Sequence, residues 1–391
     1  MRRPAILRLQ HGLSLIELMI ALLIGSILMV GVIQVFSASS NAYRLAQGMS
    51  RVQENGRFAL DYLQRDVRMV GHYGCVNDQA RLQTPGIMNS YTSAATAESP
   101  FNFAISLQGY EATGSGTSGT VNLASPAAGW MPALPAYISG LTPAPRPGSD
   151  IILMRYLYAT GAPVTAVTST QLAISPGNWS SLTRDGVATP AIFGVGDCSY
   201  VDVFQASGTD SAGGTVTTSA SGGIRTGIPD FLGHYTASPA GQTTLYRAES
   251  VLYYVATRNG ATVPSLYRVR FNTVVNSAST LHISEELVEG IDSLQLIYGQ
   301  DQSTDVGALT GNVTTFRTAA DLGDALGNEN AWRRVEQVRI GVVSSSSDLA
   351  NAAQRAQPLR ALGASFTEPN DRRFRTSYES VVALRNRLYG N

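Results

Sequence analysis

The chain has 391 residues, a hydrophobic fraction of 44% and equal numbers of acidic and basic side chains, 28 of each. This length and composition indicate a folded protein of one large or two ordinary domains, and the balanced charge argues against a nucleic-acid partner. Every basic residue is an arginine, so mechanisms that need a lysine nucleophile or a P-loop lysine are excluded.

The N-terminus has the composition of a membrane-inserted segment. Residues 1–12 contain three arginines and no acid, and residues 13–36 are predominantly apolar with Glu17 as the only charge. A secretory signal peptide would have a shorter apolar core followed by a small-residue cleavage site. The apolar run is long enough to span a bilayer, and its positive flank predicts a cytoplasmic N-terminus with all later residues facing outward.

Glu17 is the exception that the membrane anchor alone does not explain. A carboxylate within a membrane helix costs roughly 2.5 to 3.5 kcal/mol on insertion scales, so it needs a partner. Cleavage after Gly12 would create an α-amine at Leu13, and that amine on a neighbouring subunit is a suitable counter-charge. Such a pair would favour packing of subunits in register.

The segment HGLSLIELMIALLIG, residues 11–25, resembles the class III signal of type IV prepilins. The resemblance implies that a prepilin peptidase cuts after Gly12 and methylates Leu13, which makes Glu17 the fifth mature residue. Leu13 replaces the more usual phenylalanine. Gln34 stands where major pilins commonly have a proline, which favours a minor pilin. The alternative is a signal anchor in which Glu17 snorkels toward the headgroups.

Residues 37–72 are predicted to continue the helix as an amphipathic segment. A helix from Leu13 to about Val70 would be roughly 87 Å long at 1.5 Å per residue. Gly48 and Gly56 indicate either local melting during assembly or close packing against a head, and the sequence does not decide between them. Apolar residues recur at helical intervals, namely Leu45, Met49, Val52, Ala59, Leu63, Val67 and Val70.

Residues 73–391 are predicted to form a β-rich head. Gly, Ser, Thr and Pro are frequent from 76 to 149, which indicates long loops with short strands. A buried strand is expected at 150–161, with 163–175 as its hairpin partner region. Asn259 and Gly260 predict a tight hairpin turn, after which Pro264 indicates that the second strand begins late or lies at an edge. Further strands are expected at 291–299, 335–343 and 375–388.

Four blocks of the chain are similar to the PilW family of type IV pilus minor pilins. They are residues 51–75, 196–207, 287–301 and 375–388, whereas 80–148 and 208–245 are unmatched. The resemblance implies an α+β pilin fold, in which a long N-terminal helix with a transmembrane first half packs on a mostly antiparallel β-sheet head. The J-type minor pseudopilins of type II secretion are also similar.

The two cysteines, Cys75 and Cys198, predict one disulfide in an oxidising compartment, because the chain is export-directed. Both fall in the blocks that resemble PilW. Two separate buried thiols are the alternative. The four histidines are scattered, so no metal site is predicted through Cys or His. Asp301 and Asp305 faintly suggest a calcium loop, but they lack the other closely spaced oxygen ligands.

No catalytic motif is recognised, so neither an enzyme nor a cofactor is expected. The PilW resemblance implies a minor pilin that helps to prime pilus assembly at or near the tip. Its expected partners are the prepilin peptidase, other minor pilins, the major pilin and the inner membrane, with a tip adhesin as a further candidate. We expect a single-pass protein with a periplasmic head that later joins the pilus at the cell surface. Alternatives are a type II secretion pseudopilin and a membrane-anchored exoenzyme or receptor.

Overall fold

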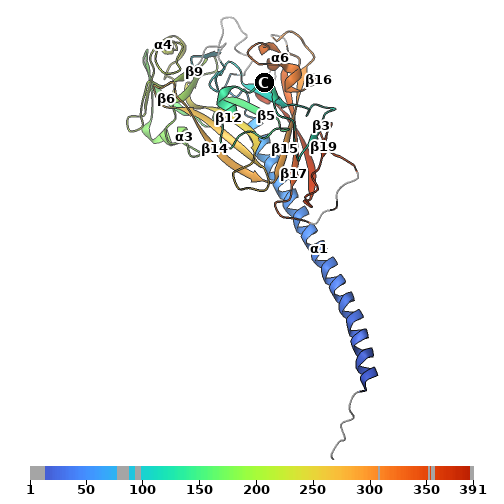
Figure 1. Cartoon of the computed structure of the whole chain (residues 1–391). Coiled ribbons are helices and arrows are strands. Elements are labelled where there is room, and N and C mark those ends of the chain that lie inside the picture. The colour runs from blue at the N-terminus through green and yellow to red at the C-terminus, as the bar shows by residue number, and fades with distance from the viewer. Residues whose placement is uncertain are drawn as a thin grey trace, which may run out of the picture.

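The computed structural model describes residues 14–76, 88–92, 98–306, 309–350, 353 and 357–387. A single long helix, α1 (Leu15–Val67), projects from a head that is built mainly of antiparallel strands (Figure 1). This arrangement confirms the predicted α+β fold class. The first half of α1 is exposed, and its second half lies against the head.

Local signals define both ends of α1. The Ser14 Oγ accepts a hydrogen bond from the Glu17 amide at 3.2 Å, which caps the first turn. The helix ends at Val67, a few residues earlier than predicted. The amides of Met69 and Val70 each donate to the carbonyl three residues earlier, as in a 3₁₀ turn. Gly71 then takes a left-handed conformation with φ of 71°.

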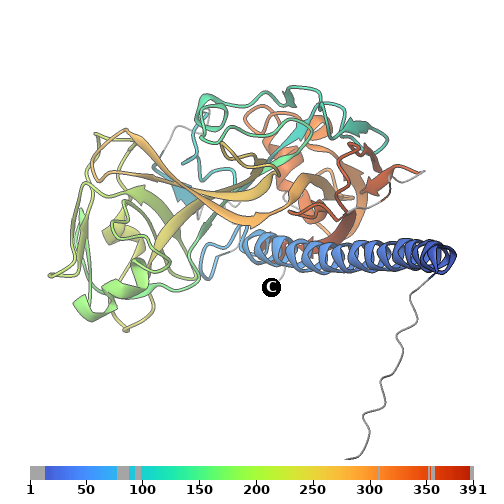
Figure 2. The same ribbon diagram turned by 60° about the horizontal axis from the view of Figure 1, so that its bottom comes forward.

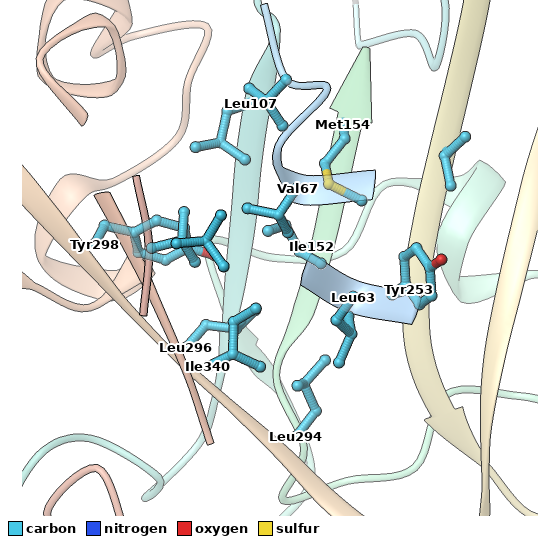
Figure 3. Close-up of a cluster of buried hydrophobic side chains, with 14 of the residues drawn as sticks. Leu63, Val67, Leu107, Ile152, Met154, Tyr253, Leu294, Leu296, Tyr298 and Ile340 are labelled. Carbon is cyan, nitrogen blue, oxygen red and sulfur yellow. The ribbon is translucent and has the colours of Figure 1, made fainter. Parts of the chain in front are cut away.

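One face of α1 enters the core of the head. Its buried side chains continue into a cluster that includes Ile152, Tyr253 and Ile340 (Figure 3). Met49, which the periodicity places on the same face, is 39% exposed, and the neighbouring Gly48 is buried instead. The buried residues of the helix are Gly48, Val52, Gly56, Ala59, Leu63, Asp66 and Val67.

The two glycines of α1 are explained by close packing. The helix is continuous through Gly48 and Gly56. A Cβ at Gly48 would lie 2.7 Å from the Cβ of Ala350, and one at Gly56 would lie 2.2 Å from Cδ2 of Tyr378. Both distances are too short for a methyl group, so these positions let the backbone of α1 approach the head.

We therefore expect Gly56→Ala to destabilise the head. Overpacking of this kind costs about 1 to 3 kcal/mol, and a gain in helix propensity of up to about 1 kcal/mol offsets only part of it. Urea unfolding of the purified protein measures the difference. Gly31→Ala is the matched control, because a Cβ there would meet nothing within 4 Å. Equal midpoints for the two variants would contradict the packing account.

A thirteen-stranded sheet forms most of the head, and all its pairings are antiparallel except β1 with β9. Its central strand β12 pairs with β5 and β13 along its second half and with β6 and β8 at its start. The strands are β1 (Met88–Ser90), β2 (Leu107–Ala112), β4 (Trp130–Met131), β5 (Ile151–Leu157), β6 (Ala162–Val167), β7 (Gln171–Ile174), β8 (Ile192–Gly196), β9 (Val201–Gln205), β10 (Gly208–Asp210), β11 (Thr215–Thr217), β12 (Thr244–Ala256), β13 (Ser265–Thr273) and β14 (Thr280–Glu289).

Two smaller sheets complete the head. The four-stranded sheet has the order β16-β15-β17-β20, and the three-stranded sheet has the order β18-β19-β3 with β19 and β3 parallel. Their strands are β15 (Ile291–Asp301), β16 (Val313–Arg317), β17 (Val335–Ser345), β20 (Arg375–Ala383), β3 (Thr120–Asn122), β18 (Leu359–Ala361) and β19 (Ala364–Thr367). Short helices are α2 (Ala136–Ser139), α3 (Trp179–Leu182), α4 (Phe231–His234), α5 (Ala319–Leu322) and α6 (Glu329–Arg333), with 3₁₀ turns at Pro176–Asn178 and Arg385–Arg387.

Residues 162–235, with strands β6 to β11 and helices α3 and α4, form a side lobe. It has its own hydrophobic cluster, in which Phe204 and Phe231 pack edge to face. Figure 2 shows this lobe at the end of the head, away from the shaft of α1. The long strand β12 joins it to the part of the head that packs on the helix.

The predicted strands at 150–161, 291–299, 335–343 and 375–388 are confirmed as β5, β15, β17 and β20. The partner predicted for β5 is wrong, because β6 and β7 pair with each other while β5 pairs with β2 and β12. The predicted hairpin is confirmed, because β12 and β13 pair antiparallel, and the Ala261 amide donates to the Arg258 carbonyl at 2.9 Å across a turn centred on Asn259 and Gly260. The connection, residues 257–264, is longer than predicted, and only Gly260 of the Asn-Gly pair has a positive φ. Pro264 does delay β13, which begins at Ser265.

Candidate functional site

The projecting half of α1 presents an apolar surface on every side. Among the described residues, α1 is the one helix that is long and apolar enough to cross a membrane. Exposure of this surface to water is unfavourable, because burial of apolar surface stabilises a protein by roughly 25 cal/mol for every Å². The large exposed side chains there are Leu15, Ile16, Leu18, Met19, Ile20, Leu22, Leu23, Ile24, Ile27, Leu28, Met29, Val30, Val32, Ile33, Val35 and Phe36.

Glu17 is the single acidic residue of this surface and lies in the first turn of α1. Its side chain is exposed, and the positive end of the helix dipole favours a carboxylate at this place. Gly12 and Leu13, the predicted cleavage and methylation positions, lie outside the described residues. The pairing of Glu17 with a new N-terminus therefore stays a prediction.

Two small residues interrupt the apolar surface. A Cβ at Gly25 or at Gly31 would meet no atom of this chain within 4 Å. Glycines at such positions let neighbouring helices approach closely. The free half of α1 is thus suited to packing against other helices, in lipid or in a filament.

A disulfide joins the end of the helical region to the side lobe. Cys75 and Cys198 are bonded, with their Cα atoms 4.9 Å apart. Cys75 follows α1, and Cys198 lies between β8 and β9. Both residues are exposed, so the bond holds two surface segments rather than filling the core.

The loop that follows β15 is closed by Asp301 through protein donors. Its carboxylate accepts hydrogen bonds from the amides of Ser303, Thr310 and Asn312 at 2.6 to 3.0 Å. The Thr310 hydroxyl donates as well. In the part of the chain that the structure describes, no group of three or more His, Cys, Asp or Glu residues is placed to hold a metal ion. These contacts give Asp301 a structural role.

Two carboxyl groups that the sequence analysis did not single out are buried together in the head. Asp150 accepts hydrogen bonds from the amides of Ala112 and Leu296 and from the hydroxyl of Ser115 at 2.8 to 2.9 Å, and so connects β2 to β15. Ser115 also lies 3.2 Å from Glu111 Oε1. Burial raises the pKa of Asp150 to about 7, and burial together with the Asp150 charge raises the pKa of Glu111 to about 9.

These two groups predict a head that loses stability as the pH rises. A group with a raised pKa in the folded state holds its proton more tightly there than in the unfolded chain, so its contribution is present at low pH. The contribution of Asp150 is lost as the pH rises from its ordinary pKa of 3.8 to about 7. The contribution of Glu111 is lost as the pH rises from its ordinary pKa of 4.5 to about 9. Urea midpoints should therefore be lower at about pH 9 than at about pH 6.

Glu111→Gln should flatten this pH dependence, whereas Glu54→Gln, at an exposed carboxylate of α1, should leave it unchanged. A remaining slope is expected from Asp150 and from Glu336, since burial raises the pKa of each to about 7. A midpoint that rises from about pH 6 to about pH 9 would contradict the assignment.

Comparison with known protein families matches both ends of the chain. The prokaryotic N-terminal methylation motif matches residues 7–33, which include Gly12, Leu13 and Glu17. The model for type IV pilus-assembly protein W matches residues 252–386. The chain is therefore similar to the PilW family along this part of its head. No curated protein and no solved structure matches it.

The PilW match covers the part of the head that packs on α1. It begins within β12 and ends in the 3₁₀ turn after β20, whereas the side lobe lies outside it. The methylation motif implies processing by a prepilin peptidase and partners that belong to a pilus system. Together the two matches support a pilin associated with the type IV pilus, and the apolar helix fits anchoring in the inner membrane.

Proposed function

We propose that this chain is a minor pilin of the PilW type that helps to prime type IV pilus assembly in a complex of minor subunits at or near the tip. Residues 1–12 form a leader that is removed after Gly12. Residues 13–36 anchor the protein and later pack in the filament core, 37–72 carry the helix into the head, and 73–391 form the periplasmic head. Other minor pilins, the major pilin and a tip adhesin are its proposed partners.

The observation that carries this proposal is the combination of the methylation motif with a freely projecting apolar helix. A soluble enzyme would have to cover the large apolar surface of residues 15–36, whereas a filament subunit uses it for packing. Glu17 supports the same view, because a membrane anchor has no need of a carboxylate. Catalysis has no part in the proposed role.

The N-terminus of the native protein provides the decisive experiment. Mass spectrometry of the purified protein should find a chain that begins at N-methylated Leu13. A chain that retains Met1 and the basic residues that follow would overturn the proposal. Gly12→Val, which obstructs the cleavage position, should keep the leader attached, and Gly31→Val should be processed normally.

Deletion of the gene distinguishes a role in the type IV pilus from a role in the related type II secretion system. Loss of twitching motility with protein secretion intact is the expected result. Loss of secretion with normal motility would instead assign the chain to the secretion system as a pseudopilin.

A further inference from the structure

Strand β14 (Thr280–Glu289) is an open edge of the main sheet. Among the described residues it pairs only with β13, so every second backbone amide and carbonyl on its outer side has no strand partner. Residues 280–283 are all exposed, and Leu281 and Ile283 keep 46% and 58% of their surfaces exposed. Figure 1 shows β14 along the border of the head next to α1.

Natural proteins normally protect such an edge with lysine, proline, a bulge or a covering segment. The stretch Thr280–Ser284 of β14 has no proline, lysine or arginine, and the bulge in the ladder comes only later, opposite Leu266 and Tyr267. This half of the edge is therefore open to the addition of another strand.

Two hollows lie on one face of the sheet beside this edge. The larger, of about 420 Å³, is bordered by Tyr62 of α1, Arg268 and Glu285. The smaller, of about 190 Å³, is bordered by Arg270 and Ile283. Ile283 and Glu285 are two residues apart, which is the spacing of side chains on one face of a strand. A strand added to β14 would place its own alternate side chains beside the same two hollows.

The floor of the larger hollow is held by a chain of polar contacts. Glu285 Oε2 lies 2.7 Å from the Arg268 guanidinium, which in turn lies 3.6 Å from Asp66 Oδ2. The hydroxyl of Tyr253 donates to Asp66 at 2.6 Å. These contacts connect β14 through β13 to α1, so the hollow is formed before a partner arrives.

We propose that β14 binds an extended segment of a different pilus subunit by strand addition. Backbone hydrogen bonds along the free edge would supply affinity, and the two hollows would select alternate side chains. The chemistry of the edge favours an apolar residue beside Ile283. Two positions away it favours an arginine or lysine beside Glu285, because this side chain stays 52% exposed although it pairs with Arg268, and cross-strand pairs of opposite charge are favourable. This inference rests on the proposed role in a pilus.

A second copy of the same strand fits the edge poorly. β14 contains Glu285, Glu286 and Glu289 and no arginine, so it has no cation to offer to its own acidic half. A parallel self-pairing in register would set each of these carboxylates opposite another, which is destabilising. The end of β14 also lies against α1, where Asn55 Nδ2 donates to the Glu289 carbonyl at 2.9 Å. A different subunit packed along α1 would meet the edge at this place.

Hydrogen exchange measured by mass spectrometry tests the proposal on the full-length protein, in detergent micelles and in sheared pili. We expect amides within 280–287 to exchange at least about tenfold more slowly in pili. Immunodetection of the protein in pili tests the proposed function separately. If the protein is present in pili but β14 stays unprotected, the strand-addition inference alone is overturned. If the protein is absent from every pilus preparation, both that inference and the proposed function are overturned. Protection that rises with protein concentration in micelles would identify a second copy as the occupant and overturn the choice made here.

A substitution at the edge gives an independent measurement. Ile283→Lys should lower the amount of the protein in pili by about tenfold, because a charge at an open edge opposes strand addition. Leu232→Lys in α4 is the matched control, since Leu232 is 62% exposed and lies outside β14. Thermal unfolding shows that both variants are folded. Equal incorporation of the two variants would overturn the proposal.

Discussion

Glu17→Ala is expected to leave cleavage after Gly12 intact and to lower the amount of the protein in pili by more than about tenfold. If the proposed pairing holds, the variant removes the carboxylate that neutralises the new α-amine of a neighbouring subunit. An uncompensated charge in an apolar surrounding costs about 3 to 5 kcal/mol, and each 1.4 kcal/mol is a factor of about ten in an equilibrium. Quantitative immunoblots of sheared pili measure incorporation, and the mass of the membrane-bound protein reports cleavage.

Ser26→Ala is the matched control for this experiment. Ser26 is an uncharged polar residue of the apolar run, and its hydroxyl donates to the Leu23 carbonyl within the same helix at 2.8 Å. Its removal leaves no charge unpaired, so incorporation should not change. Undiminished piliation with Glu17→Ala would show that the charge pair does not drive assembly, even if processing at Gly12 is normal.

The second large effect is expected from removal of the disulfide. The bond closes a loop with a sequence separation of 123 residues. In the chain-entropy model this loop length corresponds to roughly 4 to 5 kcal/mol of stabilisation, because the unfolded chain is constrained. Cys75→Ser combined with Cys198→Ser should therefore lower the free energy of unfolding of the head by up to this amount, as measured by urea denaturation.

Reductant provides the internal control. Wild-type protein treated with reductant should unfold at the same urea concentration as the double variant, and the variant should not respond to reductant. Peptide mapping under non-reducing conditions checks the bond directly. Two free thiols in the native protein, or an unchanged unfolding midpoint in the variant, would contradict the expectation.

The sequence by itself determined those features that depend on neighbouring residues. The apolar run after Gly12, the helical period up to Val67 and the β-branched and aromatic runs of β5, β15, β17 and β20 are local patterns, and each appears in the structure as predicted. The prepilin motif is local too, which is why the prepilin signal was recognisable from the N-terminus. Where a prediction required a partner strand, as for β5, it was wrong, because strand pairing depends on residues far away in the chain.

Only the tertiary structure decided how these elements meet. It showed that Gly48 and Gly56 serve close packing, since Ala350 and Tyr378 come from about 300 residues further along the chain. It also brought Glu111 beside Asp150 and left β14 at the edge of the sheet. The physical reason is the same in each case. Steric contact, desolvation and exposure of a backbone edge are set by what surrounds a residue in space, and a linear sequence does not contain that information locally.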